Sequence, residues 1–129
     1  MTQAAITFDL DGLHRDLFIQ QPSSAERARL RDLACEAVVP RILSWLDSLD
    51  VSATFFAIGE DVERHPAVFR AMAAAGHEIA NHTVSHLRDF SRQPAATIRA
   101  EVERGGDIIA STVGRQPVGF RAPGYTITS

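Results

Sequence analysis

Two histidines four residues apart and two aspartates two residues apart are the residues of this sequence best suited to chemistry. His82 and His86 follow one short apolar segment, and Asp9 and Asp11 follow another. Imidazole nitrogen and carboxylate oxygen are ligands that zinc and similar divalent ions take in proteins, and a catalytic site uses three of them and keeps a position for water. The two histidines and one of the aspartates would make such a set. The other aspartate would be free to act as a general base.

A divalent ion held in this way lowers the pKa of a water molecule towards about 7 and stabilises the oxyanion that forms on attack, so the set predicts hydrolysis of an amide or ester. Each pattern alone also has a simpler interpretation. Histidines at this spacing are commonly a surface or capping pair, and aspartates after a strand commonly form a solvated turn. Arg121, which precedes Ala-Pro-Gly, is by itself a surface arginine. The hypothesis therefore depends on whether the fold brings these residues together.

Alternation of strands and helices provides that arrangement. Residues 4–8, 51–59, 77–80 and 118–121 have the β-branched and apolar composition of strands. Helices are expected after Ser23, which forms a capping-box pattern with Glu26, and from Pro40, Pro66 and Pro94. Strands that alternate with helices predict an α/β fold with a parallel sheet, whose strands end at a shared edge where ligands bind. The aspartates, the histidines and Arg121 all follow strands, so they should converge at that edge.

Several further residues carry structural expectations. Trp45 belongs to the apolar face of the helix that begins at Pro40 and is expected in the core. Cys35 is the only cysteine, and it is expected to be a buried, inert thiol. Gly76 is expected in a left-handed helix cap. Gly105 and Gly106 should each weaken the last helix by about 1 kcal/mol relative to alanine.

Composition limits the class of protein. The 129 residues are 45% hydrophobic with a net charge of −3, which suits one globular domain. All 13 basic residues are arginines scattered along the chain, so no nucleic-acid or anionic-membrane partner is expected. No apolar run approaches the roughly 20 residues of a membrane helix, and no signal peptide precedes the first strand, so a cytoplasmic location is expected.

Four segments resemble a known family. These are TFDLDG at 7–12, ATFFAIG at 53–59, GHEIANHTVSH at 76–86 and FRAPGY at 120–125. The first, third and fourth segments resemble the first three motifs of the polysaccharide deacetylases, also called the NodB homology domain or carbohydrate esterase family 4, and the second segment resembles the family's second strand. The resemblance covers roughly residues 4–126. It implies a deformed (β/α) barrel and the metal-dependent removal of acetyl groups from N- or O-acetylated carbohydrate, such as a polysaccharide or peptidoglycan.

The resemblance also implies roles for individual residues. Asp11, His82 and His86 would hold one divalent metal ion, most often zinc, with cobalt or another ion as the alternative. Asp9 would take a proton from the attacking water, and Arg121 would orient and charge-pair Asp9. A backbone N–H near Gly124 or Tyr125 would help to hold the oxyanion.

This sequence departs from the common family pattern in three places. Leu10 separates the two aspartates, as in a branch that contains certain peptidoglycan deacetylases and cyclic-imide hydrolases. Tyr125 follows Gly124, where the common form places an aromatic residue before the glycine. The sequence reaches Ser129 before the last two family motifs, which supply a tryptophan-containing pocket wall and the histidine that protonates the leaving amine. Residues 1–129 are therefore expected to be the N-terminal part of a single, incomplete deacetylase domain.

Two other functions are compatible with these residues. One is a cyclic-imide or ureide hydrolase, allantoinase-like, on the same fold. The other is a non-catalytic fragment that binds glycan or a partner, with self-association through an exposed sheet edge. Three histidines outside the motif pair are weaker candidates: His14 could touch substrate or metal, His65 is expected at a helix start, and His77 is expected to lead into the third strand.

Overall fold

The computed structural model describes residues 4–12, 15 and 23–125, with only the backbone of Tyr125. Three parallel strands form one sheet in the order β1-β2-β3. They are β1 (Thr7–Asp9), β2 (Thr54–Ala57) and β3 (Glu78–Asn81). In their register Phe8 lies opposite Phe55, and Phe55 lies opposite Ile79. The expected parallel α/β arrangement is confirmed, and the sheet formed by the described residues is open rather than closed into a barrel.

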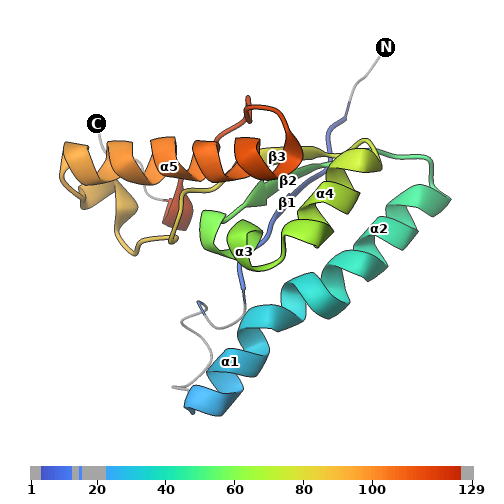
Figure 1. Ribbon diagram of the computed structural model, residues 1–129, viewed down its shortest axis with the longest axis horizontal. Helices are drawn as coiled ribbons and strands as arrows, with labels where there is room; N and C mark the ends of the chain where they lie inside the picture. Colours follow the sequence, from blue (N-terminus) through green and yellow to red (C-terminus); the bar gives the residue numbers. More distant parts are fainter. Residues whose placement is uncertain (1–3, 13–14, 16–22, 126–129) are drawn as a thin grey trace.

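Helices connect the strands and flank the sheet. The helical elements are α1 (Ser24–Leu33), a π-helical stretch (Ala34–Val38), α2 (Val39–Ser48), α3 (Gly59–Arg64), α4 (Pro66–Ala74), a 3₁₀ turn (Phe90–Arg92), α5 (Ala95–Val113) and a second 3₁₀ turn (Pro123–Tyr125). Figure 1 shows α1 and α2 as one continuous rod at one side of the molecule and α5 at the other, with α3 and α4 between them. None of the helices in the described ranges is long and apolar enough to cross a membrane.

Local sequence signals account for several helix ends. Ser23 caps α1, and its hydroxyl accepts from the Glu26 N–H while the Glu26 carboxylate accepts from the Ser23 N–H, as the capping box predicts. Gly76 and Gly114 follow α4 and α5 with φ of 87° and 79°, a conformation that costs glycine little. The caps at Ser23 and Gly76 confirm the expected start of α1 and end of α4.

The core lies between the sheet and the helices. Phe8 stacks on Phe55 with ring centroids 5.0 Å apart. Cys35 is buried in this core, as expected. The largest side chains with almost no exposed surface include Leu46 of α2, Phe55 of β2, Phe69 and Met72 of α4, and Ile109 of α5.

The structure differs from four expectations about side-chain burial and element boundaries. Trp45 is 52% exposed rather than in the core, because the buried side of α2 is formed by Val39 and Leu46 and Trp45 lies beside that stripe. The second strand ends at Ala57, and Gly59 opens α3, which the sequence did not predict. Residues 118–121 form one bridge from Phe120 to Asn81 instead of a strand. The helix expected from Pro40 is also continuous with α1 through the π-helical stretch.

Candidate metal centre

The carboxyl ends of β1 and β3 place the predicted site residues at one edge of the sheet. Asp9 is the last residue of β1, and His82 follows the last residue of β3. Leu10 continues the β1 ladder, since its N–H donates to the Phe56 carbonyl at 3.0 Å, and its side chain is buried. Side chains alternate along an extended chain, so Asp9 and Asp11 lie on the face opposite Leu10. Burial of Leu10 thereby orients the two aspartate side chains towards the site.

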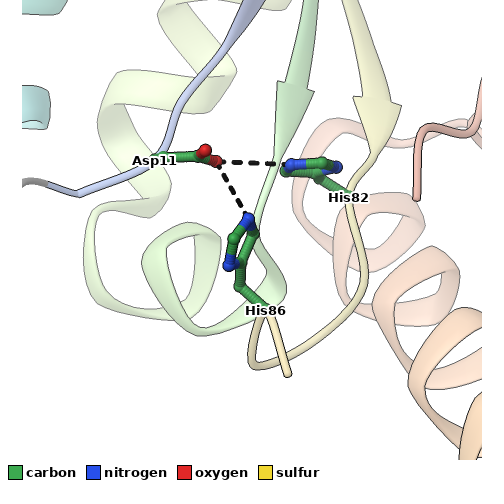
Figure 2. Close-up of side chains that lie close together, drawn as sticks. All are labelled: Asp11, His82 and His86. Carbon is green, nitrogen blue, oxygen red and sulfur yellow. Dashed lines mark ion pairs between the residues drawn. The ribbon is translucent and has the colours of Figure 1, made fainter. Parts of the chain in front are cut away.

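Asp11, His82 and His86 come together in space, as the convergence of strand ends predicts. Figure 2 shows the Asp11 carboxylate facing both imidazoles. Asp11 Oδ1 lies 3.3 Å from His82 Nε2 and 3.5 Å from His86 Nε2, and one ligand atom from each residue lies within 4.8 Å of the others. Two ligands at about 2.0–2.1 Å from a tetrahedral ion are roughly 3.3 Å apart. The three side chains therefore have the spacing of a three-ligand metal site.

The hydrogen bond made by the far side of the His82 ring fits the same interpretation. His82 Nδ1 lies 2.6 Å from the Arg121 carbonyl oxygen, which can only accept, so Nδ1 is the nitrogen that carries the proton. In neutral His82 the Nε2 lone pair then faces the Asp11 carboxylate, and two acceptors at 3.3 Å need a cation or a second ring proton between them. Metal-bound histidines commonly have this outer hydrogen bond, which fixes the tautomer.

The charges at the site reinforce one another. Burial by itself would raise the pKa of Asp11, but the hydrogen bonds and positive charge of His82 and His86 outweigh it and hold that pKa well below its usual value. Burial by itself would lower the pKa of His82, but the Asp11 carboxylate and the Arg121 carbonyl together raise it. Asp11 is accordingly an anion that favours positive charge at this position, whether from an imidazolium or from a bound cation.

Asp9 and Arg121 form a second pair beside this cluster. Arg121 Nη1 donates to Asp9 Oδ1, and Nη2 donates to Thr7 Oγ1 at 3.1 Å. The guanidinium lies 3.9 Å above the centre of the Phe56 ring, which adds a cation–π contact. These contacts hold the Arg121 guanidinium against β1. Arg121 engages Asp9 through Oδ1, so these bonds do not involve Asp9 Oδ2.

The remaining sequence candidates fall into two groups. Gly124 lies in an exposed turn with φ of 80°, whereas His14 and the Tyr125 side chain lie outside the described residues. His65 lies between α3 and α4, as expected, and its Nε2 is 3.0 Å from Asp32 Oδ1. His77 leads into β3, as expected, and its Nδ1 accepts from the Ala53 N–H at 3.2 Å. These last two histidines serve structural roles away from the site.

Sequence reasoning missed several residues that contact the loop between His82 and His86, among them Arg15, Asn81 and Glu101. Asn81 Oδ1 accepts from the Thr83 N–H at 2.9 Å. Glu101 in α5 accepts from the Ser85 N–H at 2.9 Å and from its hydroxyl at 3.0 Å. The available sequence signal was indirect: a glycine pair in a helix, one turn after Glu101, can mark a close approach to another segment.

The chain resembles known proteins in sequence. The family model for polysaccharide deacetylase matches residues 3–129. Over 85 residues the chain is 41% identical to a chitooligosaccharide deacetylase of Bradyrhizobium sp. (strain ANU 289), a match that covers 65% of this chain and 38% of that protein. Over 84 residues it is 33% identical to a peptidoglycan-N-acetylglucosamine deacetylase of Bacillus cereus, covering 65% of this chain and 30% of that protein. The chain thus matches about a third of the length of these curated relatives.

Solved structures agree with the sequence matches. A predicted polysaccharide deacetylase from Mycobacterium smegmatis is 36% identical with a TM-score of 0.77, over 92% of this chain and 42% of that one. A pseudoenzyme of carbohydrate esterase family 4 from Bacillus anthracis is 27% identical with a TM-score of 0.63, over 66% of this chain and 30% of that one. The family model matches nearly every residue of the chain, and the chain has the fold of the family's solved structures. The chain therefore belongs to the polysaccharide deacetylase family.

Proposed function

We propose that this chain supplies the metal-binding half of a zinc-dependent deacetylase that removes acetyl groups from N- or O-acetylated carbohydrate, such as a polysaccharide or peptidoglycan. The observation that carries the proposal is the Asp11–His82–His86 cluster with the Asp9–Arg121 pair beside it. Zinc suits this donor set because it accepts imidazole and carboxylate ligands in a tetrahedral arrangement. Cobalt or another divalent ion has the same ligand preferences in part.

A divalent ion at this position would supply Lewis-acid polarisation of the acetyl carbonyl and a lowered pKa for a water molecule. The side chains would supply the rest. Asp9 would take the proton of the attacking water at Oδ2, since Arg121 Nη1 engages Oδ1. Arg121 would hold the Asp9 carboxylate in place. A backbone N–H at Gly124 or Tyr125 would donate to the oxyanion.

The first experiment measures metal content. The 129-residue chain should bind one equivalent of zinc in a titration, and Asp9→Asn should bind it as well as the wild type. His82→Ala should lose it. His65→Ala is the matched control, because His65 is paired with Asp32 away from the cluster, and it should bind normally. Absence of stoichiometric zinc in the wild type would refute the zinc-dependent reaction.

The second experiment measures turnover in the longest protein that contains this chain, with acetylated chitooligosaccharide and peptidoglycan as substrates. Asp9→Asn should abolish acetate release while zinc remains bound. Retained activity in this variant would refute the role of Asp9. The relatives include a pseudoenzyme, so a protein that binds zinc and glycan but releases no acetate would favour the non-catalytic alternative. Hydrolysis of a cyclic imide or ureide, with or without bound metal, would favour the allantoinase-like hydrolase.

A further inference from the structure

The loop between the two histidines has an unusual backbone. Thr83 and His86 have φ of 69° and 54°, in the left-handed region that non-glycine residues rarely occupy. Thr83 is also β-branched, which makes this conformation less favourable still. The loop must turn tightly to return His86 to the side of His82 (Figure 2). Such a conformation persists only where surrounding contacts impose it.

One carboxylate makes three of those contacts, and the Gly59 and Glu60 N–H groups make two more by donating to the Thr83 and Val84 carbonyls at 2.9 and 3.0 Å. Glu101 Oε2 accepts from the N–H groups of Val84 and Ser85 at 3.1 and 2.9 Å, and Glu101 Oε1 accepts from the Ser85 hydroxyl at 3.0 Å. On the other side of the loop, Arg15 Nη1 donates to the Ser85 carbonyl at 2.7 Å. The middle of the loop is therefore held through both its N–H and its C=O groups.

The helix that carries Glu101 lies unusually close to the loop. A Cβ added at Gly105 would lie 2.6 Å from Asn81 Oδ1 and 3.1 Å from the Thr83 carbonyl carbon. Asn81 joins the two segments, since its Nδ2 donates to the Val102 carbonyl at 2.8 Å while its Oδ1 accepts from the Thr83 N–H. Residues four apart share a helix face, so the close approach at Gly105 aims Glu101 at the loop.

We propose that Glu101 is a positioning residue of the metal centre. Its carboxylate holds the Val84–Ser85 backbone, and through it the strained turn, so that both imidazoles meet Asp11 before a metal binds. The inference deepens the proposed function and rests on it. Glu101 contacts neither His82 nor His86 in the bonds described above, so it acts on them through the loop. Loss of an outer contact of this kind typically weakens metal binding by about 10- to 100-fold.

The test compares the zinc dissociation constants of four variants by competition with a chromophoric chelator. Glu101→Asp keeps the charge but shortens the side chain, and Glu101→Ala removes both; each should weaken binding by about 10- to 100-fold. Glu101→Gln keeps the length, with an oxygen for the backbone donors and an amide that can donate to the Ser85 hydroxyl, and should stay within a few-fold of the wild type. Glu103→Gln is the control on the same helix, because the partner of Glu103 among the described residues is Arg99, 3.6 Å away in an exposed pair.

Amide hydrogen exchange supplies a readout that needs no metal. The Val84 and Ser85 amides of the metal-free chain should exchange faster in Glu101→Asp than in the wild type, and at the wild-type rate in Glu103→Gln. If Glu101→Ala fails to fold, the aspartate and glutamine variants still decide the matter.

The opposite ranking, with weak zinc binding in Glu101→Gln and normal binding in Glu101→Asp, would mean that Glu101 acts through its charge and would overturn the inference. Wild-type affinity in Glu101→Asp would overturn it as well, and would leave the metal centre standing. A wild-type chain that binds no zinc would overturn the proposed function and this inference together.

Discussion

Adjacent glycines in α5 should respond in opposite ways to the same substitution. Alanine is favoured over glycine in a helix interior by about 1 kcal/mol, and this gain applies to Gly105→Ala and Gly106→Ala alike. At Gly106 the nearest atoms to an added Cβ are 3.7 Å away, which is ordinary contact. Gly106→Ala should therefore raise the free energy of unfolding by about 0.5–1 kcal/mol.

At Gly105 the added Cβ meets Asn81 Oδ1 at 2.6 Å and the Thr83 backbone at 3.1 Å. Overpacking of a filled interior costs about 1–3 kcal/mol. Displacement of the Asn81 side chain also gives up its bond to the Thr83 N–H, worth about 0.5–1.5 kcal/mol. Because the helix-propensity gain cancels between the two variants, Gly105→Ala should be less stable than Gly106→Ala by about 1.5–4.5 kcal/mol.

Urea unfolding followed by far-UV circular dichroism, in buffer free of divalent metal, measures this difference directly. Each variant serves as the control for the other, since they are neighbours in one helix and carry the same substitution. Equal stabilisation of both variants would refute the close packing of α5 on the histidine loop. A changed denaturant dependence in Gly105→Ala alone would instead indicate that the variant alters the compactness of one of the two states.

Three further predictions concern charge, reactivity and helix capping. In the metal-free chain the raised pKa of His82 contributes stability that is present below its ordinary value of 6.5 and is lost as pH rises through the folded value. The free energy of unfolding should therefore fall as the pH rises above the ordinary value of 6.5, and a pH-independent value would contradict the pairing with Asp11. Burial, with nearby carboxylates, raises the pKa of Cys35 to about 12, so an aromatic disulfide reagent should modify it only as fast as the chain opens; rapid reaction of the native chain would disprove this. Ser23→Ala should lower the free energy of unfolding by about 1 kcal/mol, whereas Ser24→Ala, which leaves the cap intact, should not; equal losses would exclude the capping role.

Much of the site could be predicted because its residues follow strands. Parallel strands end at one edge whatever their separation in sequence, so Asp9, Asp11 and His82 had to lie near one another once the strands were identified. The spacing of His86 from His82 then placed a third donor. The proximity of Asp11, His82 and His86 is confirmed by the geometry. Their role as ligands stays a prediction until metal binding is measured.

The elements that sequence reasoning missed lack a local signal. The residue before α3 is Ile58, whose side chain makes no capping bond, and it continues an apolar run that is typical of a strand. For Trp45 the sequence does carry a local signal, but the signal is misleading. Its position in an apolar stretch predicts burial, but helical periodicity cannot tell which edge of a wide apolar face a neighbour will cover. Among the described residues, Val39 and Leu46 are covered and Trp45 is not.

Gly105 shows why the sequence underestimates the supports of a site. A propensity scale counts this glycine only as a weakness of the helix, because the scale compares residues in isolation. In the fold the missing side chain makes room for Asn81 and the Thr83 backbone, and the same approach brings Glu101 within reach of Ser85. Each of these contacts joins residues that are far apart along the chain, and none leaves a spacing pattern. The histidine pair could be recognised because His82 and His86 lie in one short segment. The Glu101 contacts that support this segment come from α5, which follows it in the chain.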